Sequence, residues 1–142
     1  MREQLVQSAL DSLVSGYPIL IFTLIPLAVV YLLGLFIYVK LTPYRELELV
    51  QQGNMAAAVT FSALVVSLAL PLAACLVNRY SIFETTLWGV VSLILQLLLF
   101  RVTDAIFKGI PERIEGNEVP AATVFASFKI AGSILLAFAI GG

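Results

Sequence analysis

The sequence predicts an all-α integral membrane protein: four transmembrane helices as two tandem, parallel two-helix repeats, preceded by a short amphipathic interfacial helix. Three observations predict this fold. The 142-residue chain is 61% hydrophobic and 12% charged, whereas a soluble domain is about 25% charged. It contains four apolar segments of the length that crosses the roughly 30 Å hydrocarbon layer. A short motif at the start of the second segment recurs at the start of the fourth.

Residues 1–16 are expected to form the interfacial helix. Their apolar side chains share one helical face, whereas the polar ones lie elsewhere; the apolar set is Leu5, Val6, Ala9, Leu10, Leu13 and Val14. A helix with one apolar face rests at the boundary between lipid headgroups and acyl chains. The four-helix membrane domain is then expected to occupy residues 17–142.

The four predicted spans are 17–39, 55–77, 83–100 and 119–140. The first two contain no charged side chain, the third is free of charge from Thr85 to Phe100, and the fourth is interrupted only by Lys129. About 20 apolar residues suffice to cross a bilayer. Tyr38 is expected at the membrane interface, where amphipathic rings gather. Each of the four segments is therefore predicted to be a membrane helix.

Prolines and small residues predict how these helices bend and pack. Pro18 and Pro120 are expected in the first turn of their helices, where the missing N–H is tolerated. Pro26 and Pro71 lie inside helices and should kink them. Small residues concentrate in the second and fourth spans, so these two helices are expected at the centre of the bundle.

An internal repeat organises the chain. Gly53-Asn54 and the Ala-rich segment after it recur 63 residues later as Gly116-Asn117. The predicted unit is a helix, a loop, a Gly-Asn pair and an Ala-rich helix, with repeat one at 17–77 and repeat two at 83–140. Because each unit has two spans, the two copies should share one orientation.

The two Gly-Asn pairs allow two interpretations. Asn is a favoured N-cap, and Gly accepts the bend before it, so the pairs would simply begin two helices. Alternatively, Gly53, Asn54, Gly116 and Asn117 would place two positive helix ends around an anion such as a lipid headgroup.

Lys129 lies about ten residues into the fourth span, where a lysine costs about 2.5–3.5 kcal/mol. In one interpretation its side chain extends toward the water at the start of the helix. In the other it faces the bundle or an oligomer axis, paired with Glu84, Asp104, Gln96 or a lipid phosphate. Gln96, Ser92 and Thr60 are further intramembrane polar residues, and they serve either as hydrogen bonds between helices or as the lining of a polar path.

Composition excludes several functions. The chain has no His and one Cys, Cys75, so neither the usual zinc sites nor an internal disulfide can form. No nucleophile with an adjacent base is visible. We therefore expect no enzymatic activity, no metal and no cofactor. The formal net charge of −1 excludes nucleic acid as a partner.

The chain resembles the bacterial inner-membrane family known as domain of unknown function 350, the YjfL-like proteins. The segments that carry the resemblance are Thr42-Pro43-Tyr44 with Glu46, Gly53-Asn54 with Ala56 to Ala58, Pro71-Leu72-Ala73, Trp88-Gly89 with Gln96, and Ile114-Glu115-Gly116-Asn117. The resemblance implies four helices in two repeats in the bacterial plasma membrane, a genetic context of envelope stress and polyamine-related genes, and no established activity or catalytic residue.

The preferred functional hypothesis is a non-enzymatic membrane component linked to envelope stress. It would assemble with itself in the bilayer and contact peripheral envelope-stress proteins through loops 40–54 and 101–118. The alternative is an oligomeric channel or small-solute transporter with Lys129 and Gln96 near the path.

The distribution of Lys and Arg predicts the orientation. The two loops next to the Gly-Asn pairs hold Lys40, Arg45, Arg101, Lys108 and Arg113, whereas the opposite side has Arg2 and Arg79. These two loops are therefore expected in the cytoplasm, with both termini outside.

Overall fold

The chain folds into a bundle of four long helices closed at one end by two short ones. A computed structural model describes residues 1–42, 45–77 and 81–142. The helices are α1 (Arg2–Leu41), α2 (Glu46–Gln51), α3 (Met55–Val77), α4 (Ile82–Ile106), α5 (Ile110–Glu115) and α6 (Val119–Gly141). The described residues form helices and turns without any strand, so the all-α class is confirmed. Pro43, Tyr44 and Arg79 lie outside the described residues.

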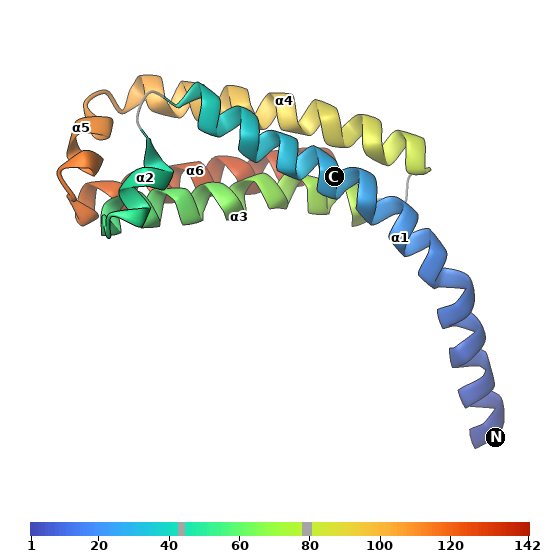
Figure 1. The fold of residues 1–142 in the computed structure, drawn as a ribbon. Helices are drawn as coiled ribbons and strands as arrows, with labels where there is room; N and C mark the ends of the chain where they lie inside the picture. Colours follow the sequence, from blue (N-terminus) through green and yellow to red (C-terminus); the bar gives the residue numbers. More distant parts are fainter. Residues whose placement is uncertain (43–44, 78–80) are drawn as a thin grey trace.

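Four helices are long and apolar enough to cross a membrane, as the sequence predicts. They are α1, α3, α4 and α6. Figure 1 shows α1 and α4 in one layer above α3 and α6, with α2 and α5 together at one end of the bundle. We call this the α2–α5 end.

The first helix differs from its prediction. Helix α1 is continuous from Arg2 to Leu41, so no break separates residues 1–16 from the first span, and Pro18 lies inside the helix instead of in its first turn. The residues up to Leu20 are exposed, and this part of α1 curves away from the bundle (Figure 1). Each proline inside the helix removes one N–H from its ladder, which permits such bending. That residues 1–16 lie in the interface stays a prediction.

Helix α3 forms the centre of the bundle. It contacts α1, α4 and α6, and its interface with α6 is the largest in the protein. Its small residues Ala56, Ala57 and Ala63 are buried, because small side chains let helix backbones approach closely in lipid. The sequence predicts that the second and fourth membrane helices are both central. This holds fully for α3 but only in part for α6, because much of α6 is exposed on the side away from α3.

Apolar packing joins α1, α3 and α4 along the rest of the bundle. The core cluster contains Leu27, Leu64, Leu68, Leu72 and Leu93. Gly89 lets α4 approach α1, because a Cβ atom there would lie 2.6 Å from Cδ2 of Leu27. This packing holds α1 and α4 over α3, and so positions their polar side chains at the α2–α5 end.

Candidate functional site

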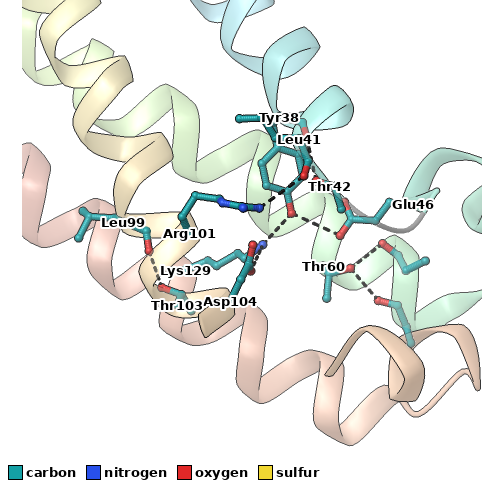
Figure 2. Close-up of polar contacts among 12 residues, drawn as sticks. Tyr38, Leu41, Thr42, Glu46, Thr60, Leu99, Arg101, Thr103, Asp104 and Lys129 are labelled. Carbon is teal, nitrogen blue, oxygen red and sulfur yellow. Dashed lines mark hydrogen bonds and ion pairs between the residues drawn. The ribbon is translucent and has the colours of Figure 1, made fainter. Parts of the chain in front are cut away.

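Lys129 is enclosed by the bundle. The residue is 1% exposed, and its ammonium Nζ donates a hydrogen bond of 2.7 Å to the hydroxyl of Tyr38 on α1. It also forms an ion pair of 3.5 Å with Oδ1 of Asp104 on α4. Figure 2 shows the lysine side chain reaching from α6 toward both partners. A charge placed in lipid is tolerated when it faces such partners inside a bundle.

The Tyr38 hydroxyl extends this arrangement to the short helix α2. It donates a hydrogen bond of 3.4 Å to Oε1 of Glu46, which is the first residue of α2 and only 4% exposed. We call Lys129, Tyr38, Glu46 and Asp104 the lysine network. It joins α6, α1, α2 and α4 at one point, and so ties the short helix to the membrane bundle (Figure 2).

Three aromatic rings surround the ammonium. Its Nζ lies 4.5 Å from the ring centroid of Phe125, 4.9 Å from that of Tyr38 and 5.3 Å from that of Phe100. The rings of Tyr38 and Phe100 meet edge to face at 5.6 Å. Ring faces attract a cation, by about 2 kcal/mol or more when both groups are desolvated. The rings therefore support the charged lysine where water is scarce.

These contacts decide between the two interpretations of Lys129. Its side chain does not extend to water, since the side chain is 0% exposed. It faces the bundle and pairs with Asp104, one of the four partners considered. Glu84 lies at the opposite end of α4, where it is exposed and closes a capping box with Ser81.

Asp104 connects the network to the surface. Its side chain is 32% exposed, and it lines a small crevice together with Tyr38, Thr42 and Arg101. The guanidinium of Arg101 donates a hydrogen bond of 3.5 Å to the carbonyl of Leu41 across this crevice. The ammonium is thus sealed, whereas its carboxylate partner reaches the α2–α5 end.

The sequence does not predict two members of the network, Tyr38 and Glu46, as part of the environment of Lys129. Tyr38 was interpreted as an interface aromatic, and Glu46 as an acid in a loop. Their position in the chain could have indicated them. Tyr38 and Glu46 are eight residues apart, and both lie at the end of the bundle where Asp104 lies. A buried lysine needs a carboxylate or another acceptor within its reach, and Tyr38, Glu46 and Asp104 supply these near the helix ends.

Gln96, Ser92 and Thr60, the polar residues predicted inside the membrane spans, are buried as well. Gln96 and Ser92 lie on the inner face of α4, and Thr60 lies on that of α3; they are 0–1% exposed. Thr60 and Ser92 donate to carbonyls of their own helices, at 3.0 Å to Ala57 and 2.9 Å to Gly89. Both hydroxyls therefore bond within their own helices, and Ser92 also forms a side-chain hydrogen bond with Cys75 on α3.

The Gly-Asn pairs are brought together at the α2–α5 end. Asn54 accepts the N–H of Ala57 at 2.9 Å, as an N-cap does. Its amide also donates to the carbonyls of Ile114 and Glu115 at the end of α5, at 2.8 and 3.3 Å. One side chain thus ends α5 and begins α3, which links the two halves of the chain.

Asn117 plays a different part from Asn54. Its Oδ1 accepts the N–H of Ala56 on α3 at 3.1 Å, and its own helix α6 has Glu118 at the N-cap. The prediction that Asn117 caps its own helix is therefore wrong. The N–H groups of Ala56 and Ala57, which an anion at the start of α3 would need, are bonded by the two asparagines.

The backbone relates the two turns by 64 residues, one more than the sequence motif. The left-handed residues are Gly53, with φ 85°, and Asn117, with φ 59°. The N–H groups of Gly53 and Asn117 donate to Val50 and Ile114 in the same way. Gly116, with φ −75°, is not in the left-handed region. Asn accepts that region more readily than most residues, so Asn117 takes the place that Gly53 has in the first turn.

Comparison with known proteins identifies the family. The family described as Domain of Unknown Function (DUF350) matches residues 11–140. The chain belongs to the DUF350 family. It is similar to the UPF0719 inner membrane protein YjfL of Escherichia coli K12, at 32% identity over 100 residues that cover 70% of this chain and 76% of that protein. The protein of the same name from E. coli O157:H7 matches equally. No solved structure matches the chain.

The four membrane-length helices agree with membership of a family of membrane proteins. A relative named for the inner membrane and four apolar helices together support a multi-pass inner-membrane protein. DUF350 is a family of uncharacterised membrane proteins, and no enzymatic role comes with it. The matched range contains the whole lysine network and both Gly-Asn turns.

Proposed function

We propose that the protein is a non-enzymatic, self-assembling component of the bacterial inner membrane, and that a groove between α3 and α6 receives a second copy of the chain. The observation that carries the proposal is this groove of about 450 Å³ on the membrane surface of the bundle. Small and hydroxyl-bearing side chains line it, among them Ala58, Ser62, Ala63, Thr123, Ala126 and Ser127.

The lining favours a helix over lipid as the occupant. Elsewhere α6 presents bulky side chains to the membrane, such as Phe128, Leu135 and Phe138, which are 54–76% exposed. The groove is lined by three alanines and three hydroxyl-bearing residues, together with Met55, Val59, Val66 and Ile130. Its small residues let two helix backbones come close, as is typical of helix contacts in bilayers. The hydroxyls of Ser62 and Ser127 donate within their own helices, to the carbonyls of Ala58 and Thr123. A partner helix could therefore cover them without burying a polar group that lacks a hydrogen bond.

The lysine network favours assembly over the transport hypothesis. An oligomeric channel with Lys129 near its path needs that residue at a surface between protomers. Its ammonium is instead enclosed within one protomer by Asp104, Tyr38 and aromatic rings. This arrangement supports a role in holding α1, α2, α4 and α6 together.

Filling the groove tests self-assembly. The double variant Ser62→Leu with Ser127→Leu places two bulky apolar side chains in the groove without removing any bond between helices. Native mass spectrometry of the full chain in nanodiscs should show an oligomer for the unaltered protein and a monomer for the variant. Thr86→Leu is the matched control, because its hydroxyl also bonds within one helix, to Ile82, away from the groove. A monomeric unaltered protein, or a variant that assembles normally, would refute the proposal.

We further propose that the α2–α5 end, with loops 40–54 and 101–118, contacts peripheral envelope-stress proteins in the cytoplasm. Its exposed charges support this: Arg45 pairs with Glu48 at 2.8 Å and Arg113 with Glu118 at 2.6 Å. Surface pairs like these add little stability and are available to a partner.

A photo-crosslinking residue tests this contact in cells. Placed at Glu48, it should yield a protein adduct that increases under envelope stress, whereas the same residue at Phe83, exposed at the opposite end of the bundle, should not. Equal adducts at both positions, or none at Glu48, would contradict the proposal.

A further inference from the structure

We propose that Gln96 and Ser67 bind water inside the bundle, and that this internal hydration site adjoins the lysine network. The inference is independent of self-assembly, because it concerns the interior of one protomer.

The first observation is a buried carboxamide without partners. Gln96 is 1% exposed, and neither its Nε2 nor its Oε1 has a hydrogen-bond partner in the part of the chain that the structure describes. A carboxamide offers two donors and an acceptor with two lone pairs. Burying such a group without hydrogen bonds is costly, and buried side chains of this kind are nearly always paired with protein or ordered water.

The second observation is a buried hydroxyl on another helix. Ser67 on α3 is 0% exposed, and its Oγ has no partner among the described residues. Its carbonyl accepts the hydroxyl of Ser133 on α6. The neighbouring hydroxyls of Thr60 and Ser92 bond within their helices. Of these four buried side chains, those of Gln96 and Ser67 therefore lack a partner among the described residues.

Both groups lie about one helical turn from the lysine network. Gln96 precedes Phe100 by four residues, and the ring of Phe100 lies 5.3 Å from the Lys129 ammonium. Ser133, which bonds Ser67, follows Lys129 by four residues. Residues four apart are neighbours on one helix face. Gln96 and Ser67 therefore lie about one helical turn from the residues that carry or contact the ammonium, on the side away from the α2–α5 end.

Water is the ligand that fits these groups. A buried water makes about three hydrogen bonds, both donating and accepting, as the carboxamide and the hydroxyl require. The crevice beside Asp104 at the α2–α5 end holds about 10 Å³, roughly the space of one water. Leu97 and Phe100 in its wall are neighbours of Gln96 on α4. A side chain of a partner protein could not reach Gln96, since the surrounding helices cover it.

Solid-state NMR of the isotope-labelled full chain in lipid bilayers tests the site. Magnetisation transferred from water should reach the side-chain amide of Gln96 several-fold faster than that of Asn54. Asn54 is the matched internal control, because it is also a buried carboxamide but donates to the carbonyls of Ile114 and Glu115. Transfer to Gln96 as slow as transfer to Asn54 would overturn the proposal, and this comparison needs no variant.

Two variants locate the water. Gln96→Leu removes the carboxamide at similar volume, and it should reduce water transfer to Ser67 and Ser133. Ser92→Ala, on the same face of α4, removes a hydroxyl that donates to the carbonyl of Gly89 in its own helix, and it should leave that transfer unchanged. Equal transfer to Ser67 and Ser133 in Gln96→Leu and in the unaltered protein would show that Gln96 holds no water there.

Discussion

Removing Asp104 should destabilise the protein more than removing Lys129, although the two residues form one ion pair. Asp104→Asn leaves an ammonium that is fully enclosed, whereas Lys129→Met leaves a carboxylate whose side chain is 32% exposed. An unpaired charge destabilises the folded protein more when it is fully buried than when it is partly exposed to water. Both variants should therefore be less stable than the unaltered protein, and Asp104→Asn should be the less stable of the two.

The geometry sets the size of the effect. At 3.5 Å and an effective dielectric constant of about 20, two unit charges attract by about 5 kcal/mol before desolvation is subtracted. We expect Asp104→Asn to lower the free energy of unfolding by about 3 kcal/mol. Lys129→Met should cost about 1–2 kcal/mol, for the lost hydrogen bond to Tyr38 and the lost ring contacts. The double variant should resemble Lys129→Met, because the aspartate is needed only while the lysine is present.

A double-mutant cycle measures this dependence. Unfolding of the four proteins in lipid bicelles, followed by steric trapping, should give a coupling energy of about 2–3 kcal/mol. Lys108→Met, at an exposed lysine near the same end, is the control and should change stability by less than about 0.5 kcal/mol. Additive losses, or Asp104→Asn more stable than Lys129→Met, would refute the assigned contact.

Three further predictions concern the remaining contacts. Tyr38→Phe keeps the ring but removes the hydroxyl between Lys129 and Glu46, and it should cost about 1–3 kcal/mol; Tyr31→Phe, which loses one bond to the carbonyl of Val65, should cost less in the same unfolding assay. Asn54→Ala should lower the free energy of unfolding by about 2–3 kcal/mol and speed hydrogen exchange at Ala57. Asn117→Gly should lower it by about 1 kcal/mol or less, because glycine suits the φ of 59° at this position. Equal losses in the two variants would contradict the linking role of Asn54. Gly89→Ala should lower the melting temperature because of the 2.6 Å approach of Leu27, and Gly132→Ala, which meets nothing within 4 Å, should not.

The membrane spans could be predicted because the length of a span is fixed by the bilayer. The predicted segment 55–77 coincides with α3, and the predicted start of the fourth segment coincides with that of α6. The start of α1 could not be found in this way. Hydropathy changes near residue 17, but a helix continues wherever its backbone hydrogen bonds continue, and Pro18 removes only one of them.

The partners of Lys129 were harder to predict than its burial. A lysine in the middle of a span requires a compensating group, so its pairing was one of two expectations, and Asp104 was one of four candidates. Choosing among them depends on which helices meet at that depth. The sequence alone does not contain that information, because the angles between helices are set by contacts such as the approach of Gly89 to Leu27.

The lysine network does not follow the spacing that relates the Gly53 and Asn117 turns. At the spacing of 64 residues that relates the helices, α2 and α5 begin with Glu46 and Ile110, and α3 has Val65 where α6 has Lys129. Glu46 and Lys129 thus have apolar counterparts, whereas Asp104 corresponds to Lys40, which is also charged. The carbonyl of Val65 accepts the hydroxyl of Tyr31. A charge in lipid costs about 2.5–3.5 kcal/mol, so it is retained only where α1, α2 and α4 supply partners. The two turns at the α2–α5 end thus share their backbone geometry, whereas the charges of Glu46 and Lys129 each occur once at this spacing.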